Sequence, residues 1–311
     1  MSDVITRFAP APTGYLHLGH VLNAKYVWNF ARAHNGRVLL RIEDHDRQRC
    51  RPEYEAALYE DLAWLGFVPD VIVPRQSERD AAYRDVLASF IARGLVFGCT
   101  CTRAEYAEYV GPSFSLVDSN EVVGPSFSLV DNSEVVGPSF SLVDMAKLKL
   151  GPTYPGPTCG SRRHCPCRDR DIALADDVNW RVRFEPGMET FTDLLCGPQT
   201  QDPAAQCGDL MIHDRLGNWT YQWAATIDDV LQNVTHVIRG VDLLDSTGRQ
   251  IRLARLAGRA GPATFMHHPL IMKTPTQKLS KSDGDTGIRE MRARGMSPAD
   301  VLALADDAAP C

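Results

Sequence analysis

Two short segments of the chain carry basic side chains at a spacing that suits the binding of phosphate groups. The first, PAPTGYLHLGH at residues 10–20, is a turn with proline and glycine that runs into a helix start. His17 and His20 are three positions apart and would share one face of that helix. The N–H groups and the dipole of a helix N-terminus also favour anions. Gly19 would let an adenine or ribose ring come close to the backbone.

The second segment is KLSKS at residues 278–282, in a loop flanked by glycine and proline. A basic loop of this kind can cover phosphates and neutralise the charge that develops on a leaving pyrophosphate. Alone, the two histidines are also compatible with surface side chains or a metal-binding pair, and the lysines with a solvated loop. Together, one near each end of the chain, they predict an ATP site. The predicted ATP contacts are His17, Gly19, His20 and Lys281, and the predicted catalytic residues are His17, His20, Lys278 and Lys281.

Four stretches of the sequence resemble the glutamyl-tRNA synthetase family of class I synthetases. They are RFAPAPTGYLHLGH, LLRIEDHD, YQWAATIDDVLQNVTHVIRGVDLLDSTGRQ and KLSKSDG, and the resemblance covers nearly the whole chain except a repeated segment. It implies a Rossmann-like α/β catalytic domain that converts L-glutamate and ATP into glutamyl-adenylate, with Mg²⁺ on the phosphates. Catalysis would be positional and electrostatic, without a covalent enzyme intermediate.

The length of the chain indicates one branch of that family. About 30 residues follow the lysine loop, which is too few for a further helical domain that binds the anticodon. The branch without that domain transfers the glutamyl group to the queuosine base at the wobble position of tRNA(Asp). Two alternatives stay open: a truncated enzyme that charges the 3′ end of a tRNA, and a non-catalytic paralogue that only binds.

Free glutamate needs cationic groups for its two carboxylates and an anionic group for its ammonium. Arg7 and Arg239, each at the end of a predicted strand, would bind the carboxylates, and Glu43 would hold the ammonium. Tyr221 would add a hydroxyl. The alternative for Arg7 and Glu43 is a structural salt bridge. The resemblance also implies contacts from the segment Arg7, Phe8, Ala9, Pro10 and Ala11, where Ala11 replaces the usual serine of the family and would lose its hydroxyl contact.

Cysteines gather in one stretch of the chain and predict a structural zinc site. Cys99 and Cys101 form a Cys-x-Cys pair, and zinc in structural sites takes four tetrahedral ligands. The resemblance implies that a tyrosine and a further cysteine complete the set, and these would be Tyr154 and Cys159. Four residues separate this pair, where the family pattern has three.

A second Cys-x-Cys pair, Cys165 and Cys167, is the alternative completion and would make a four-thiolate site. The chain has nine cysteines, and no export signal is visible at its start. Thiols or metal ligands are therefore expected in place of a disulfide framework. Reduced thiols without a metal are the remaining interpretation.

The overall charge places limits on the partners. A net charge of −6 argues against indiscriminate binding of nucleic acid, although local arginine clusters can still steer a tRNA. No apolar run approaches the roughly 20 residues that span a bilayer. We expect a cytoplasmic protein with no membrane partner and no obligate protein partner. One basic cluster, which is alternatively a solvated helix face, is Arg249, Arg252, Arg255 and Arg259.

The order of the predicted elements is typical of a parallel α/β sheet. Hydrophobic spacing predicts strands at 4–8, 38–42, 178–184 and 208–213, helices at 13–34, 52–65, 81–93 and 243–256, buried segments at 221–227 and 234–239, and a last helix from about 297. We expect two halves of a catalytic domain at 1–98 and 178–260, an inserted zinc-binding subdomain at 99–177, and the KLSKS loop with short C-terminal helices at 261–311.

A 13-residue motif is repeated within residues 110–145, as VGPSFSLVDSNEV, VGPSFSLVDNSEV and VGPSFSLVD. This period is shorter than a solenoid unit, and each copy carries a Gly-Pro pair that interrupts regular structure. The repeats therefore predict an insertion that the surface tolerates. A functional loop is the alternative.

Overall fold

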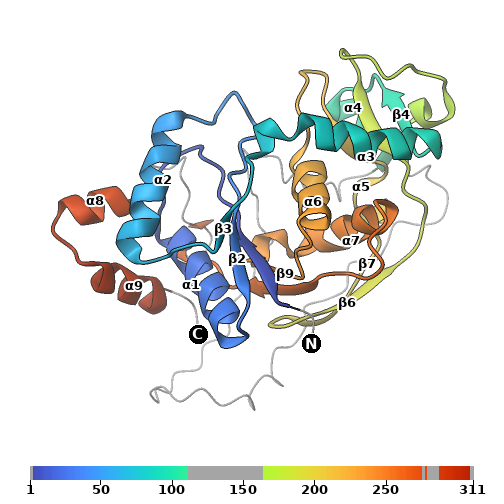
Figure 1. Ribbon diagram of the computed structural model, residues 1–311. Helices are drawn as coiled ribbons and strands as arrows, with labels where there is room; N and C mark the ends of the chain where they lie inside the picture. Colours follow the sequence, from blue (N-terminus) through green and yellow to red (C-terminus); the bar gives the residue numbers. More distant parts are fainter. Residues whose placement is uncertain (1–2, 111–163, 275–276, 279–286, 309–311) are drawn as a thin grey trace.

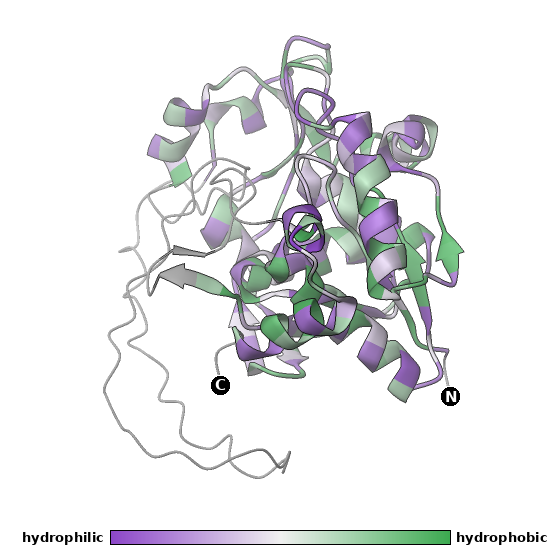
Figure 2. Ribbon diagram, turned by 90° about the vertical axis from the view of Figure 1, so that its left-hand side faces the viewer, coloured by the Kyte–Doolittle hydropathy of each residue, from purple (hydrophilic) through white to green (hydrophobic). Residues whose placement is uncertain are grey.

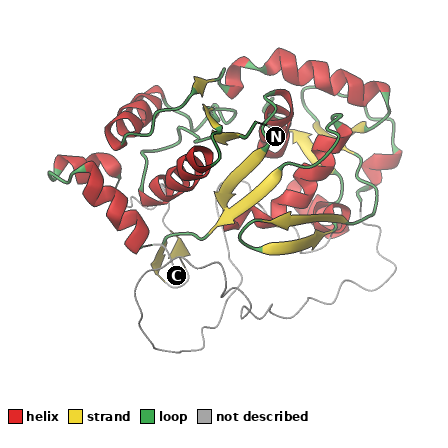
Figure 3. Ribbon diagram, turned by 60° about the horizontal axis from the view of Figure 1, so that its bottom comes forward, coloured by secondary structure: helices red, strands yellow, loops and turns green. Residues whose placement is uncertain are grey.

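A mostly parallel central sheet forms the body of the protein in the computed structural model, which describes residues 3–110, 164–274, 277–278 and 287–308 (Figure 1). One part of the sheet has the strand order β3-β2-β1, and the other has the order β9-β10-β6-β7. The two parts meet where the backbone N–H of Thr235, just before β9, donates to the Ile5 carbonyl of β1 at 2.8 Å. Helices lie on both sides of these strands (Figure 3). This is the arrangement of a doubly wound, Rossmann-like fold.

The first half of the sheet is built from parallel strands joined by helices. In the register of β1 and β2, Arg7 lies opposite Leu39, next to the carboxyl end of β1. Helix α2 begins at Pro52, which suits a first helical turn, and ends at Gly66, whose φ of 79° favours glycine. The elements are β1 (Ile5–Phe8), α1 (Leu18–Ala33), β2 (Arg37–Leu40), α2 (Pro52–Leu65), β3 (Val71–Ile72), η1 (Gln76–Glu78) and α3 (Asp80–Ala92).

The second half places β10 between β9 and β6, and β10 runs parallel to both. Helices α6 and α7 pack against this half, and α6 is buried along nearly its whole length. Its elements are β6 (Glu189–Asp193), β7 (Gly197–Gln201), α6 (Tyr221–Leu231), β9 (His236–Gly240), η4 (Val241–Ser246), α7 (Thr247–Leu256) and β10 (Thr264–His268).

A separate antiparallel sheet carries the cysteine-rich part of the chain. Strand β5 pairs with β4 on one side and with β8 on the other, so this sheet takes strands from before residue 99 and after residue 178. Its apolar face packs on α3 and α6 through Phe90, Trp180 and Trp223. The elements are β4 (Val96–Cys99), α4 (Arg103–Val110), η3 (Pro166–Asp169), β5 (Asn179–Val182), α5 (Pro203–Cys207) and β8 (Leu210–His213).

The C-terminal part returns to the first half of the sheet. Helix α9 packs on α1, where the Lys25 ammonium donates to the Leu302 carbonyl at 2.9 Å. Ser297 and Asp300 form the capping box that starts α9, which confirms the helix predicted from about residue 297. The elements are β11 (Met272–Thr274), β12 (Gln277–Lys278), α8 (Ile288–Ala293) and α9 (Pro298–Asp307).

The arginine cluster at 249–259 is divided: Arg255 is exposed, as a solvated helix face predicts, whereas two of the arginines on α7 are buried. Arg249 and Arg252 are buried, with 6% and 8% of their surface exposed, so they form neither a basic surface nor a solvated face. Arg252 instead donates to the Glu189 carboxylate at 2.8 Å. Figure 2 shows how hydrophilic and hydrophobic residues alternate along the helices that cover the sheet. Within the described parts of the chain, no helix combines the length and the apolar character needed to cross a bilayer.

Candidate active site

The histidine signature forms the N-terminus of α1. The predicted start at residue 13 is wrong, because the helix begins at Leu18. His17 is its N-cap. The Nδ1 atom of His17 accepts from the Gly19 N–H at 3.1 Å, and Nδ1 of His20 accepts from the His17 N–H at 3.2 Å. The two ring centroids are 4.0 Å apart. Both imidazoles therefore gather at one helix terminus, as the sequence predicts.

These capping bonds fix the protonation pattern of the two rings. A nitrogen that accepts a hydrogen bond carries no proton, so each neutral ring has its N–H at Nε2. The rings are half-buried and can present these Nε2 donors to an anion. Gly19 has a further structural role, because a Cβ there would lie 2.9 Å from Cε1 of His17. A side chain at this position would push the cap away.

One end of the lysine loop is held near this helix terminus, and the other end is paired with strand β11. Lys278, on β12, pairs through its backbone with Met272. Gly287, where the described chain resumes, forms a bridge with His17, and the Ile288 N–H donates to the Leu16 carbonyl at 2.8 Å. The C-terminal end of the loop, at Gly287, is thus next to the histidine signature. Lys281 lies outside the described residues, and its role stays a prediction.

The four residues expected to bind glutamate come together at the carboxyl ends of β1 and β9. Burial raises the pKa of the Tyr221 phenol, and the negative charge of Glu43 raises it further. Arg239 and Arg7 oppose this shift, so all three charged groups lie within electrostatic reach of the same hydroxyl. Glu43, Arg7 and Arg239 are each at most 5% exposed. Two cations, one anion and a hydroxyl therefore share one buried site.

Arg7 and Glu43 each have a different ion-pair partner, in place of the mutual salt bridge that was the alternative. The Arg7 Nε donates to Asp229 at 3.1 Å, and Glu43 accepts from Nη2 of Arg41 at 2.9 Å. Arg41 also donates to Asp229 at 2.8 Å. The pKa of Arg41 is raised by Asp229, Glu43 and Asp228, although burial opposes this shift. Arg41 and Asp229 thus hold the two predicted ligands in place.

The residues from Arg7 to Ala11 have different structural roles beside the predicted glutamate site. Phe8 points to the opposite face of the strand from Arg7 and packs edge-on against Trp28, with ring centroids 5.5 Å apart. The Pro10 carbonyl accepts from the Glu43 N–H at 3.1 Å, which ties the segment to the end of LLRIE. Ala9 and Ala11 are half-buried and offer only backbone polar groups. Their contacts with glutamate stay predictions.

Two further buried residues support Arg239 although no local motif marks them. The Arg239 Nε donates to Nε2 of His267 at 3.0 Å, and His267 bonds Asp193 through Nδ1 at 2.6 Å. Like Arg41 and Asp229, these residues sit beside or within apolar runs. Charged and polar groups in such runs are buried only when they are paired. Their position inside apolar stretches of the sequence could therefore have indicated that these four residues form a buried network.

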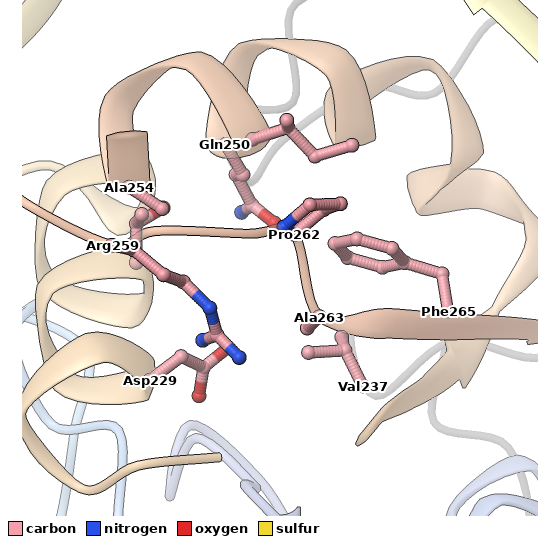
Figure 4. A pocket seen from close by; sticks show the side chains of 10 residues that line it. Asp229, Val237, Gln250, Ala254, Arg259, Pro262, Ala263 and Phe265 are labelled. Atoms are coloured by element: carbon pink, nitrogen blue, oxygen red, sulfur yellow. The ribbon is translucent and has the colours of Figure 1, made fainter. Parts of the chain in front are cut away.

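A small pocket lies between α6, α7 and the strands β9 and β10 (Figure 4). It encloses about 310 Å³ including space open to solvent, and its walls are largely the apolar side chains of Val237, Ile251 and Phe265. Its polar residues include Asp229, which bonds Arg7, and Gln250, whose Oε1 accepts from Arg239 at 2.6 Å. The pocket therefore adjoins the arginine network, and its apolar walls do not suit a dicarboxylate.

The four thiols of Cys99, Cys101, Cys165 and Cys167 cluster at the end of β4 and on η3. Their sulfur atoms all lie within 4.8 Å of one another, and the Cys99–Cys165 and Cys101–Cys167 pairs are each 3.6 Å apart. A hydrogen bond from Cys165, with help from the buried Arg181 guanidinium, lowers the pKa of Cys99 to about 5. The structure thus brings together the alternative ligand set, while Tyr154 and Cys159 lie outside the described residues.

The chain is similar to known proteins in both sequence and fold. Residues 3–113 and 158–304 match the family described as tRNA synthetases class I (E and Q), catalytic domain, and the gap in the match falls within the repeats and the stretch after them. A glutamate tRNA ligase from Elizabethkingia meningosepticum, solved in complex with its amino acid, superposes with a TM-score of 0.63 at 26% identity. The alignment covers 91% of this chain and 53% of that one, so the chain spans about half of the ligase.

Relatives of similar length carry a narrower description. A glutamyl-Q tRNA(Asp) synthetase from Symbiobacterium thermophilum is 39% identical over 306 residues, which cover 95% of this chain and 83% of the relative. One from Rhodobacter capsulatus is 36% identical over 314 residues, which cover 97% and 99%. The chain therefore belongs to the class I tRNA synthetases for glutamate and glutamine, and within them to the glutamyl-Q tRNA(Asp) synthetase family.

Proposed function

We propose that the protein converts L-glutamate and ATP into glutamyl-adenylate and then transfers the glutamyl group to the queuosine base of tRNA(Asp). The observation that carries the first step is that the buried Arg7, Glu43 and Arg239 all lie within electrostatic reach of the Tyr221 hydroxyl. The tRNA(Asp) acceptor is supported by the description of the relatives.

The charges of this group complement those of glutamate. Together with their partners Arg41 and Asp229, Arg7, Arg239 and Glu43 make a cluster of three guanidinium groups and two carboxylates, and its net charge of +1 would be offset by the net charge of −1 on glutamate. Charge-assisted hydrogen bonds of this kind are the strong ones in proteins. A glutamine side chain would leave one guanidinium without its anion, which would disfavour glutamine in this site.

The activation step would rely on position and electrostatics. The α-carboxylate of glutamate attacks the α-phosphate of ATP, and pyrophosphate leaves. The Nε2 donors of His17 and His20 would stabilise the phosphates, and Lys281 with Lys278 would offset the charge that develops on the leaving group. Mg²⁺ would enter with ATP on its phosphates.

We further propose a structural zinc ion held by Cys99, Cys101, Cys165 and Cys167. Zinc–sulfur bonds of about 2.3 Å in a tetrahedron place the sulfur atoms about 3.8 Å apart. The observed separations of 3.6 Å are close to this value and far longer than a disulfide bond of about 2.0 Å. The ion would join β4 to η3 and so close the chain segment that contains the repeats.

The first test is glutamate-dependent exchange of pyrophosphate into ATP by the unaltered chain without tRNA. We expect exchange with L-glutamate and little or none with L-glutamine. Absence of exchange, with or without tRNA, would indicate a paralogue that only binds. Arg239→Ala should weaken the binding of glutamate by about 10- to 150-fold, because a charge-assisted hydrogen bond contributes about 1.5–3 kcal/mol. The KM for ATP should change only a few-fold.

The second test identifies the acceptor. Labelled glutamate is offered to tRNA(Asp) with queuosine, to tRNA(Asp) with guanine at the wobble position, and to queuosine-containing tRNA(Asp) without its 3′-terminal adenosine. Transfer to the first and third but not the second is expected. Transfer that requires the terminal adenosine and ignores queuosine would show an enzyme that charges the 3′ end.

A further inference from the structure

A chain of three buried side chains runs from β6 to the guanidinium of Arg239. Asp193 lies at the end of β6, and His267 and Arg239 are neighbours in the register of β10 and β9. The Asp193–His267 bond is 2.6 Å long, and the His267–Arg239 bond is 3.0 Å long. The side chains of Asp193 and His267 are fully buried. Nothing in the proposed reaction uses Asp193 or His267 directly.

The hydrogen-bond roles in this chain are fixed by chemistry. A guanidinium only donates, so Nε2 of His267 accepts from Arg239 and carries no proton. The ring is then neutral with its proton on Nδ1, which donates to Oδ2 of Asp193. The other oxygen of Asp193, Oδ1, accepts from the backbone N–H groups of Leu195, Cys196 and His267 at 2.9–3.3 Å.

The remaining donors of Arg239 are also held. Its Nη1 donates to Gln250, and its Nη2 donates to the Thr247 hydroxyl and the Leu243 carbonyl. With the bond to His267, four of the five guanidinium N–H groups have protein acceptors. The Tyr221 hydroxyl also interacts with this guanidinium, so a substrate carboxylate that binds Arg239 would lie beside Tyr221.

We propose that Asp193 and His267 are positioning residues, which fix the orientation of Arg239 for the carboxylate of glutamate. This inference rests on the proposed function of the site. The neutral imidazole keeps Asp193 from pairing directly with Arg239, so the guanidinium retains its positive charge for the substrate. A direct carboxylate partner would neutralise that charge before glutamate binds. The guanidinium of Arg239 therefore has a fixed orientation, and no carboxylate of the described residues pairs directly with its positive charge.

Asp193→Asn provides a sharp test because it keeps the size of the side chain and reverses one hydrogen bond. The three backbone donors require an acceptor at the Oδ1 position, so the amide oxygen stays there and the NH₂ faces His267. Nδ1 must then accept, and the ring proton moves to Nε2. There it meets the N–H of Arg239, so two donors face each other, and the Nε2–H would have to turn to the Thr247 hydroxyl oxygen, 3.1 Å away, which in the unaltered chain accepts from Arg239.

The experiment measures pyrophosphate exchange, with separate KM values for glutamate and ATP, in the full chain. Asp193→Asn and His267→Leu should raise the KM for glutamate about tenfold or more, with the KM for ATP within about twofold. His267→Gln, which can still offer an acceptor to Arg239, should recover most of the glutamate affinity. The matched control is Asp85→Asn, at an exposed position of α3, and it should change neither KM.

A spectroscopic readout separates positioning from a general structural effect. Nitrogen NMR of the histidine rings should show the Nδ1–H form of His267 in the unaltered chain and the Nε2–H form in Asp193→Asn. Melting temperatures report whether each variant folds, and Asp193→Asn decides the question if His267→Leu does not fold. An unchanged glutamate KM in folded Asp193→Asn, or an equal rise in both KM values, would overturn the inference. Absence of exchange in the unaltered chain would overturn the proposed function itself, and this inference with it.

Discussion

Arg41, directly after β2, and Asp229, on helix α6, form an ion pair of 2.8 Å, although 188 positions separate them along the chain. The Arg41 side chain is fully buried, and that of Asp229 is 12% exposed. Asp229 also accepts from Arg7 at 3.1 Å, so one carboxylate neutralises two arginines. The pair therefore links the stability of the fold to the placement of a predicted glutamate ligand.

Asp229→Asn should destabilise the protein and weaken glutamate binding together. Removal of one partner of a buried ion pair costs about 3–5 kcal/mol, because the remaining charge is left uncompensated. At about 2–4 °C per kcal/mol for a chain of this size class, the melting temperature should fall by roughly 6 °C or more. Thermal unfolding checks this, with Asp85→Asn as the control at an exposed site. A melting temperature equal to that of the control would show that the network adds no stability.

The neutral state of His267 should appear in the pH dependence of stability. Burial lowers the pKa of His267, although its bond to Asp193 opposes the shift, while Arg239 and His268 lower it further. Folding then disfavours protonation, so the contribution of the neutral ring is complete above about pH 6.5 and is lost as the pH falls below that value. Between pH 7.5 and 5, the melting temperature should fall more steeply in the unaltered chain than in His267→Gln.

Two comparisons test that assignment. Asp85→Asn, at an exposed position of α3, changes no histidine and should keep the difference between the unaltered slope and that of His267→Gln. Parallel curves for the unaltered chain and His267→Gln would mean that His267 takes up its proton as readily in the folded state as in the unfolded one.

Local signals in the sequence predict much of the fold but little of the network that supports the site. Helix α2 matches its prediction at both ends because Pro52 and Gly66 mark those ends directly. The apolar run at 221–227 is part of helix α6, and a short run of this kind does not distinguish a buried helix from a buried strand by its pattern. Asp193 and His267 are 74 positions apart, and only the order of strands brings them together.

The ligands of the zinc site can be separated by single substitutions. Cys165→Ser should lose the metal, because a hydroxyl is a poor replacement for a thiolate that binds zinc. Cys159→Ser is the matched control and should keep one zinc per chain. Metal content after dialysis, with the melting temperature, gives the answer. Loss of zinc only in Cys159→Ser would instead support the ligand set with Tyr154.

Deletion of one 13-residue repeat, residues 111–123, should leave folding, zinc content and glutamate activation intact. Residues 111–145 of the repeats lie outside the described residues, and the family match omits residues 114–157. The entropy of loop closure depends weakly on length, so 13 fewer residues change it by well under about 1 kcal/mol. All the cysteines proposed as ligands lie outside the deleted stretch. A melting temperature lower by more than about 8 °C, or loss of zinc, would show that the repeats are part of the structure.

Lys281→Ala should slow the activation step while glutamate and ATP still bind nearly as before. Its loop starts at Lys278, which pairs with Met272, and ends at Gly287, which forms a bridge with His17, so the end of the loop is next to the proposed phosphate site. A charge needed only where negative charge develops lowers turnover, whereas a charge that holds the resting substrate raises KM. Loss of one such contact typically costs about 10²–10³-fold in rate. Pyrophosphate exchange at saturating substrates measures this loss, and Lys281→Arg, which keeps the charge, should retain more activity than Lys281→Ala. A variant with normal turnover and a raised glutamate KM would place Lys281 among the amino-acid ligands, beside Arg7 and Arg239, and away from the leaving pyrophosphate.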